Sequence, residues 1–458
     1  MSPVTPTRSE AAPNARGTLH RELGLGFGLA VVVGGTVGVG ILRTPGTIAS
    51  LLLDPALILL VWLAGGAYCL LGANNLSEVS AAVPRAGGPY VFARRAFGPY
   101  PGFLIGWSDW LTNTVPLAYL PVALAEYTAR LVPSLAGRES LVAMGTLVAF
   151  TVLNLLGLRV GSASQQVMSA AKALALLAFI SAAFFLAPAA GAATGQPPTP
   201  ALLRGSGSLW IALGAAMQLV IGTFGGWNAA SYFSEENTNP GRSVPRALIG
   251  GLVVITVAYV MVNAAYLHVL PLSEFATTNL PAANTMQAVF GGNADRVVTM
   301  LSILLLLSII NPILMFSPRI LFALSRDGFF LRQATMVNRG GTPATATIAT
   351  AMVAGVLVLS GSFERLFSIT AFLFIVVDLS VSFSLLRLRR AEPGLPRPYR
   401  ARWAPWSTRF TALCSFALLA GFISSDPRTA LVCVLMMAVS YPVFRFANRR
   451  AASGIGSA

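Results

Sequence analysis

Two apolar segments of the chain carry more glycine than a regular helix tolerates. Glycine occupies four of the seven positions 34–40, and residues 222–228 contain three more. Each glycine costs a helix interior about 1 kcal/mol relative to alanine, so both segments are expected to unwind locally. Unwound backbone at membrane depth has to be satisfied by protein groups or by a ligand. Freed N–H groups suit a carboxylate and freed carbonyl groups suit an ammonium, so the two segments predict a receptor for a small zwitterion.

Close helix packing is the alternative explanation of these glycines, because glycines four residues apart let two helices approach each other. A single segment of this kind favours packing. Two such segments at corresponding positions in the two halves of the chain favour ligand binding, since paired interruptions are typical of transporter binding sites.

Lys172 is the only lysine in the sequence, and it lies within an apolar run. Removing an ammonium group from water costs several kcal/mol, so this side chain has to reach the interface, pair with another group or lose its proton. Arginine does not lose its proton in a protein, and a chain that otherwise uses only arginine therefore indicates a need for a compact or titratable cation here. The alternative is that Lys172 extends along the helix toward Arg159 and the membrane surface.

Only membrane-spanning helices can position these residues. Of the 458 residues, 55% are hydrophobic and 10% are charged, whereas soluble domains carry roughly 25% charged residues. The surface must therefore face lipid. The net charge of +15 does not indicate nucleic acid as a partner, because the arginines lie in short gaps between apolar runs.

About twelve apolar runs are long enough to cross a hydrocarbon core, and the third is long enough to be strongly tilted. They are predicted near residues 23–43, 55–82, 98–131, 140–157, 166–187, 208–234, 246–270, 296–324, 343–360, 364–387, 407–424 and 427–446.

The arginines predict the orientation of these runs. Alternate gaps are rich in arginine, as in the cluster between Arg387 and Arg402, while the intervening gaps are poorer and contain acidic residues. The positive-inside rule places both termini in the cytoplasm, which agrees with an even number of spans. Residues 1–20 are polar and predict a disordered tail, and the stretch 187–208 predicts an external loop.

Enzymatic chemistry has little support in the sequence. It contains neither a phosphate-binding Gly-x4-Gly-Lys-Ser/Thr motif nor a His-Glu-x-x-His motif, and only two histidines. Its three cysteines lie inside apolar runs and predict neither a disulfide framework nor a metal site. No cofactor and no metal are expected, and the protein is not expected to be an enzyme.

Several motifs follow one another over about residues 22–390. They are Thr36-Val37-Gly38-Val39-Gly40-Ile41, Pro84-Arg85-Ala86-Gly87-Gly88-Pro89-Tyr90, Gly106-Trp107, Phe224-Gly225-Gly226-Trp227-Asn228, Glu235-Glu236-x-x-Asn239-Pro240, and Asn311-x7-Arg319 with Ser325-Arg326-Asp327-Gly328. In order and spacing, these motifs resemble the amino acid–polyamine–organocation superfamily. Within it, the chain is most similar to the L-type amino acid transporters and the bacterial serine/threonine exchangers.

The resemblance implies an all-α membrane protein with the LeuT-type fold. Its core would be five plus five inverted helices, with the first and sixth helices discontinuous. The chain would divide into a cytoplasmic tail, a first repeat of five spans, a second repeat of five spans, and a last part with a loop, two peripheral spans and a C-terminal tail. These parts are residues 1–21, 22–190, 191–390 and 391–458.

The resemblance also implies a substrate site. The substrate carboxylate would meet backbone N–H groups around Val37 to Gly40, and its amino group would meet carbonyl groups of the first break and of the second. In L-type relatives, two asparagines line the substrate region. The implied substrate-binding residues are Thr36, Val37, Gly38, Val39, Gly40, Gly222, Thr223, Phe224, Asn228 and Asn311, although an interhelical hydrogen bond explains either asparagine equally well.

Two positions depart from the family pattern. Val39 stands between the paired glycines, where the family usually has a small polar residue, and Gly222 stands where L-type members have an aromatic gate. Side-chain specificity and the gate therefore do not carry over, and Phe224 is the candidate for part of the gating role. At Lys172 the resemblance implies an ammonium in the cavity that holds sodium in sodium-coupled relatives, and hence sodium independence.

The expected function is sodium-independent transport of amino acids, neutral ones foremost, across the cell membrane by alternating access, either as exchange or with proton symport. Transport of polyamines or other small organic amines and a non-transporting substrate sensor are the alternatives. L-type animal relatives join a heavy subunit through a cysteine in the loop after the third span. Residues 132–138 contain no cysteine, so a disulfide-linked partner is not expected.

For four acidic residues the sequence leaves more than one role open. Asp109 and Asp378 lie within predicted spans and are costly there unless they are paired or protonated, so each is a candidate for structural pairing or for carrying a proton. Glu78 and Glu235 lie near the predicted cytoplasmic face and are candidates for ion pairs with arginines that close an inner gate.

Overall fold

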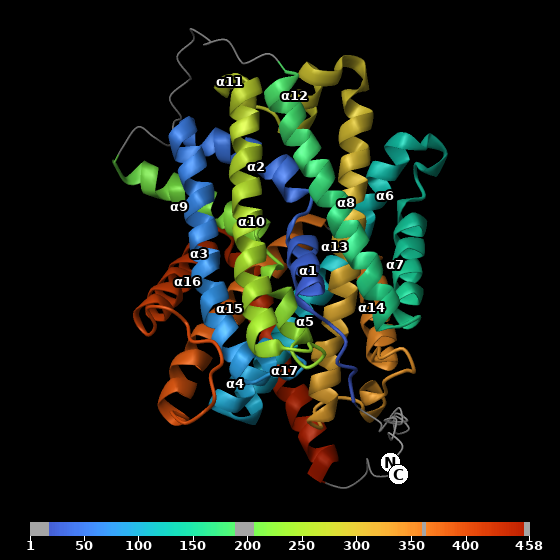
Figure 1. Ribbon diagram of the computed structural model, residues 1–458, viewed down its shortest axis with the longest axis vertical. Coiled ribbons are helices and arrows are strands. Elements are labelled where there is room, and N and C mark those ends of the chain that lie inside the picture. The colour runs from blue at the N-terminus through green and yellow to red at the C-terminus, as the bar shows by residue number, and fades with distance from the viewer. Residues whose placement is uncertain (1–17, 188–205, 360–362, 453–458) are drawn as a thin grey trace, which may run out of the picture.

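The computed structural model describes residues 18–187, 206–359 and 363–452, and these form a bundle of helices (Figure 1). Residues 1–17 of the predicted tail and most of the predicted external loop 187–208 lie outside the described residues. The helices of the first half are α1 Leu25–Thr36, α2 Gly40–Leu52, α3 Pro55–Ala82, α4 Pro89–Phe97, α5 Pro99–Thr114, α6 Pro116–Leu131, α7 Glu139–Leu155 and α8 Leu158–Phe185. Those of the second half are α9 Ser206–Thr223, α10 Pro240–Val269, α11 Leu272–Phe275, α12 Pro281–Phe290, α13 Ala294–Arg326, α14 Ala344–Val358, α15 Phe363–Ala391, α16 Trp406–Ser425 and α17 Pro427–Ala452.

Helices occupy all twelve predicted runs. Within the described ranges, eight helices are long and apolar enough to cross a membrane, and the bent pair of α1 and α2 would be a ninth. The remaining runs hold the shorter apolar helices α7 and α14 and the pair α5 and α6. An all-α membrane architecture is thus confirmed.

The run over 98–131 is the main departure from the predicted spans. The run is interrupted at one residue, because α5 ends at Thr114 and α6 begins at Pro116. Val115 between them keeps helical angles, φ −58° and ψ −41°, so the interruption is explained by the missing backbone N–H of Pro116.

Many helices begin where the sequence encodes a start. Asp54 caps α3, because its carboxylate accepts a hydrogen bond of 2.9 Å from the backbone N–H of Leu57, and Pro55 takes the first helical position. Proline likewise opens α4, α5, α6, α10 and α12. The helix starts are therefore local properties of the sequence.

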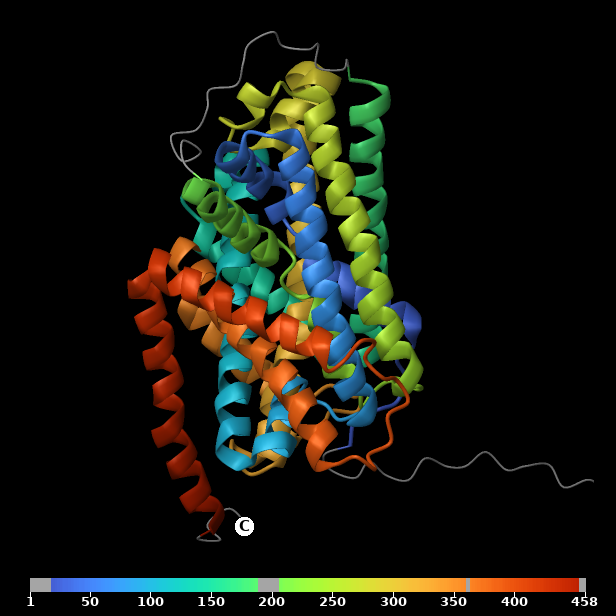
Figure 2. The ribbon, with the colours of Figure 1, turned by 90° about the vertical axis from the view of Figure 1, so that its left-hand side faces the viewer.

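The long helix α10 packs along α3 and α1, and α13 contacts α1, α6 and α8, so the broken first helix is enclosed by continuous ones (Figures 1 and 2). The last helix, α17, stands at the edge of the bundle in Figure 2. An isolated β-bridge between Leu23 and Asn237 ties the approach to α1 to the segment that follows the second break.

Among the described residues, eight ion pairs gather at the end of the bundle where the arginine-rich gaps lie, and this end is at the bottom of Figure 1. The most buried pair joins Arg319 of α13 to Glu236, whose side chains are 3% and 0% exposed. Such a pair is costly to break by removing one partner, so it ties α13 firmly to the segment that precedes α10.

Candidate functional site

The first break lies between α1 and α2, as the glycines predicted. The two helices are bent by 48° at residues 37–39, and Val37 has an extended backbone with φ −74° and ψ 103°. Helix α1 therefore ends inside the bundle with carbonyl groups that no later turn of helix satisfies. Helix α2 begins at Gly40 and presents its first N–H groups at the same place.

Lys172 reaches the carbonyl end of α1 from α8. Its side chain is completely buried, and its Nζ donates hydrogen bonds to the carbonyl of Gly34 at 2.8 Å and to the carbonyl of Val37. An ammonium at a helix C-terminus is favoured by the helix dipole as well as by these bonds. The side chain is thus directed at the break rather than along α8 to the membrane surface.

The second break follows α9. This helix ends at Thr223, Gly226 has a left-handed backbone with φ 98°, and residues 227–233 continue as the 3-10 helix η3, Trp227–Phe233. A Cβ atom on Gly226 would lie 2.3 Å from the carbonyl oxygen of Gly35. The close-packing explanation therefore also holds here, because the glycines let the two breaks touch each other.

Tyr259 of α10 joins the two breaks, and the sequence analysis missed it. Its hydroxyl lies 3.2 Å from the carbonyl oxygen of Thr36 and 3.2 Å from that of Thr223, the last residues of α1 and α9. Two turns further along α10, the hydroxyl of Tyr266 donates to the carbonyl of Ile41 at 3.1 Å. The sequence feature that could have indicated this role is the spacing of the two tyrosines, which are seven residues apart and therefore lie on one face of an apolar helix.

The remaining predicted residues of the two breaks divide into buried and partly exposed ones. Thr36, Val37, Gly38, Thr223 and Phe224 are buried, whereas Val39, Gly40 and Gly222 are partly exposed. A Cβ atom on Gly40 would lie 3.2 Å from the Thr223 methyl group, which shows that the two segments are neighbours. Residues of both breaks thus contribute the exposed backbone of the site.

Phe224 lies in an aromatic cluster behind the break. Its ring centroid is 5.0 Å from that of Tyr259 and 6.3 Å from that of Trp62 on α3. This packing holds the ring between α3 and α10. Gly222 faces a different aromatic ring. A Cβ atom at this position would lie 3.8 Å from the ring of Phe367 on α15.

The two predicted asparagines lie in different surroundings. The Asn228 amide donates to the hydroxyl of Tyr232 at 3.2 Å, and its carbonyl oxygen is buried without a partner. Asn311 is completely buried between α7, α8 and α13, where it donates to Gln165 at 2.9 Å and accepts from Asn154 at 3.1 Å. For Asn311 the structure therefore displays the interhelical hydrogen bonds of the alternative explanation.

The two acidic residues within spans are bonded to tyrosines. Asp109 of α5 accepts a hydrogen bond of 2.7 Å from Tyr232 and one of 2.9 Å from Asn113, and its second oxygen has no partner. Asp378 of α15 accepts from Tyr68 at 3.2 Å and lines a small cavity with Trp227 and Asn228. Structural pairing thus accounts for one oxygen of each carboxylate.

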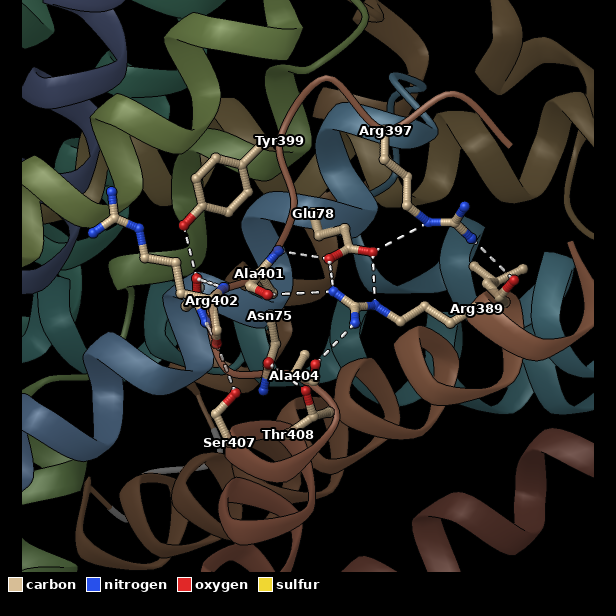
Figure 3. A network of polar contacts seen from close by, with 12 residues as sticks. Asn75, Glu78, Arg389, Arg397, Tyr399, Ala401, Arg402, Ala404, Ser407 and Thr408 are labelled. Carbon is tan, nitrogen blue, oxygen red and sulfur yellow. Dashed lines mark hydrogen bonds and ion pairs between the residues drawn. The ribbon is translucent and has the colours of Figure 1, made fainter. Parts of the chain in front are cut away.

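Glu78 and Glu235 are both paired with arginines, whose identity the sequence did not reveal. Glu78 binds Arg389 and Arg397, while Glu235 binds Arg326 at 2.8 Å and the backbone N–H of Ala86 at 2.8 Å (Figure 3 for Glu78). Each pair connects segments that are far apart in the sequence, at the end where the other ion pairs gather. The described residues contain no group of three potential metal ligands.

Two discontinuous helices that meet inside a bundle of continuous ones define an integral membrane protein of the transporter class. Comparison with known proteins specifies the family. The chain belongs to the amino acid permease family, whose model matches residues 28–441. The resemblance stated from the motifs is thereby confirmed.

The curated relatives are similar along nearly their whole length. The serine/threonine exchanger SteT of Bacillus subtilis (strain 168) is 25% identical over 455 residues, which cover 95% of this chain and 98% of the relative. The b(0,+)-type amino acid transporter 1 of Homo sapiens is 26% identical, covering 92% and 86%, and the Asc-type amino acid transporter 1 of Mus musculus is 26% identical, covering 94% and 81%.

Proposed function

We propose that this protein is a sodium-independent transporter of neutral amino acids that works by exchange. The observation that carries this proposal is the meeting of the two breaks, with the ammonium of Lys172 bonded to carbonyl groups at the end of α1. The names of the relatives, an exchanger of serine and threonine and two types of amino acid transporter, support the substrate class.

The substrate carboxylate would bind at the start of α2. The first N–H groups of a helix lack partners within the helix and carry its partial positive charge. Gly40 and Val39 are partly exposed at this point, and neither side chain is large enough to cover the backbone. A carboxylate here would receive several N–H hydrogen bonds without any basic side chain.

The substrate amino group would bind at the carbonyl groups around residues 222–224. Tyr259 and Lys172 already bond carbonyl groups at the buried side of the breaks, which leaves the partly exposed side at Gly222 for the ligand. A site assembled from backbone groups recognises the part common to all amino acids. Gly222 and Val39 add little polar character, which favours neutral substrates.

Sodium independence follows from the position of Lys172. A sodium ion would need oxygen ligands, and the carbonyl oxygens at the end of α1 are its natural source here. The ammonium of Lys172 donates hydrogen bonds to two of them and brings its own positive charge. A second cation at this place would be repelled.

Alternating access would require the arginine-rich end to open. We propose that this end faces the cytoplasm of a cell membrane, with both termini on that side, in agreement with the positive-inside rule. The ion pairs of Glu78, Glu235 and Glu236 would then belong to the inner gate, and they would have to separate for it to open. The protein would act without a disulfide-linked partner, since residues 132–138 contain no cysteine.

Reconstitution into liposomes tests the proposal. Labelled serine, alanine and a panel of other amino acids should enter only liposomes loaded with unlabelled amino acid, at a rate independent of sodium. Uptake that needs a proton gradient and no internal substrate would replace exchange with symport. Binding without flux would identify a sensor, and uptake of polyamines in place of amino acids would replace the substrate class.

A further inference from the structure

The loop between α15 and α16, residues 392–405, is held against the end of α3 (Figure 3). The carboxylate of Glu78 on α3 receives two hydrogen bonds from Arg389, at 2.9 and 2.5 Å, and one from the backbone N–H of Ala401 at 2.6 Å. Arg397 lies 3.1 Å from the same carboxylate. One buried acid thus holds two positions of the loop, Arg397 and Ala401, and the end of the helix before it.

Two neighbouring asparagines of α3 complete the attachment. Asn74 accepts hydrogen bonds from the Tyr399 hydroxyl at 2.7 Å and from the backbone N–H of Arg402 at 3.1 Å, and it donates to the carbonyl of Arg402 at 3.0 Å. Asn75 accepts a bond of 2.8 Å from Thr408 at the start of α16. The backbone of the loop therefore has a defined shape.

The outer side of this loop carries exposed basic residues. Arg400 and Arg402 are exposed, and in Figure 3 the Arg402 guanidinium points away from Glu78. Within the described ranges neither of them forms an ion pair, in contrast to the inward-facing Arg389 and Arg397. The loop thus separates arginines that fasten it from arginines that are left to bind something else.

Two tryptophans lie beside the outward-facing arginines. Trp403 is 77% exposed and Trp406 is 73% exposed, and the guanidinium of Arg409 lies 4.8 Å from the Trp406 ring. Trp403 has a left-handed backbone with φ 57°, a conformation that is strained for a bulky side chain. Strain that is maintained in order to hold a large ring outside the protein is an indication of function.

We propose that Arg400, Arg402, Trp403 and Trp406 form a binding site for the phosphate headgroup of an anionic phospholipid, in the leaflet at this end of the bundle. Guanidinium groups bind phosphate oxygens through paired hydrogen bonds. Tryptophan prefers the headgroup level of a bilayer, and basic clusters next to membrane helices attract anionic lipids. A loop that is already fixed by Glu78 and Asn74 loses little freedom on binding.

A lipid fits this surface better than a soluble anion does. A free phosphate would use only the N–H group of an indole, whereas the apolar rings of two exposed tryptophans suit the boundary between headgroups and acyl chains. The site also lies between the end of α15 and the start of α16, two helices long and apolar enough to cross a membrane, so the proposal puts it at the membrane surface. The general attraction of arginine for anionic membranes would not require a strained tryptophan or a fixed loop.

Lipid binding to the full-length protein, purified in detergent, tests this proposal independently of transport. Native mass spectrometry would count bound phosphatidylglycerol against phosphatidylcholine for the natural protein, for Arg400→Gln/Arg402→Gln and for Trp403→Ala/Trp406→Ala. We expect preferential retention of phosphatidylglycerol by the natural protein and a loss of about tenfold in affinity in the arginine variant. The tryptophan variant should also bind less, with its charge unchanged.

The matched control is Arg332→Gln/Arg339→Gln, which removes the same charge from another arginine-rich loop at this end. It should retain phosphatidylglycerol as the natural protein does. An equal loss in the control and in the test variant would mean general electrostatic attraction and would overturn the proposal. Displacement of the lipid by millimolar inorganic phosphate would likewise overturn it, because the site would then be one for a free anion.

Discussion

Replacing Lys172 with alanine removes the one side chain that donates hydrogen bonds to the carbonyl groups of both Gly34 and Val37. The fold and the break are affected differently by this change. Burial of the ammonium costs several kcal/mol, and the variant no longer bears that cost. The hydrogen bonds from a charged donor contribute about 1.5–3 kcal/mol each, so their loss offsets the relief for the fold as a whole.

The break itself has no such compensation. Without Lys172, the end of α1 loses donors for two carbonyl groups inside the membrane, and each unsatisfied group costs about 1–3 kcal/mol. The segment 37–39 then rearranges to satisfy them. If the conformation that binds substrate becomes about 3 kcal/mol less stable relative to the rearranged forms, its population and the transport rate fall by about a hundredfold.

The assay is exchange of labelled serine in liposomes, together with a thermal unfolding scan of the purified protein. We expect Lys172→Ala to elute as a folded protein with a small change in unfolding temperature and to exchange at about 1% of the natural rate or less. Gln166→Ala is the matched control, because Gln166 lies on α8 with its side chain exposed. Exchange by Lys172→Ala at the natural rate would refute the reasoning, since the break would then hold its shape without the ammonium.

Three further changes test other parts of the structure. Tyr259→Phe removes the hydroxyl between the two helix ends and should raise the KM for exchange about tenfold, as measured by titration of substrate. Gly226→Ala forces a Cβ atom against the carbonyl of Gly35 in a strained conformation and should lower thermal stability by several degrees; an unchanged unfolding temperature would show that the two breaks are not in contact. The hydrogen bond from Arg159 lowers the pKa of the Glu22 carboxyl below its ordinary value of 4.5. The ion pair of Glu22 with Arg159 therefore stabilises the folded protein above pH 4.5, and this stabilisation is lost as the pH falls below that value. The unfolding temperature of Glu22→Gln should accordingly depend less on pH between pH 5 and about pH 3 than that of the natural protein.

Much of the architecture could be predicted from the sequence, because it depends on local properties. An apolar run of sufficient length has to be helical in lipid, since every backbone group must bond within the segment. Glycine density predicted the bend at residues 37–39, and a proline at the first helical position marks where α3 and α10 start. The same local property explains the one-residue interruption before Pro116, within the run that was predicted as one span.

The partners of the buried polar groups were decided only by the tertiary structure. Glu78 and Arg389 are 311 residues apart, and nothing near either of them in the sequence indicates the other. For Asn311 the sequence left a place in the substrate region and an interhelical hydrogen bond equally open, and it did not identify Gln165 and Asn154 as the bonding partners. The direction of a side chain on a membrane helix depends on the rotation and neighbours of that helix, and those are determined by packing between helices.

The membrane-spanning character of the chain, the positions of its helix breaks and its family could thus all be read from the sequence. These features depend on hydrophobicity, backbone strain and motifs, which are local to short stretches of the chain. The convergence of Lys172 and Tyr259 on the carbonyl ends of the broken helices became visible only in the folded protein. That convergence depends on the way α8 and α10 pack around α1, because an unsatisfied carbonyl inside the membrane accepts whichever donor the neighbouring helices bring within reach.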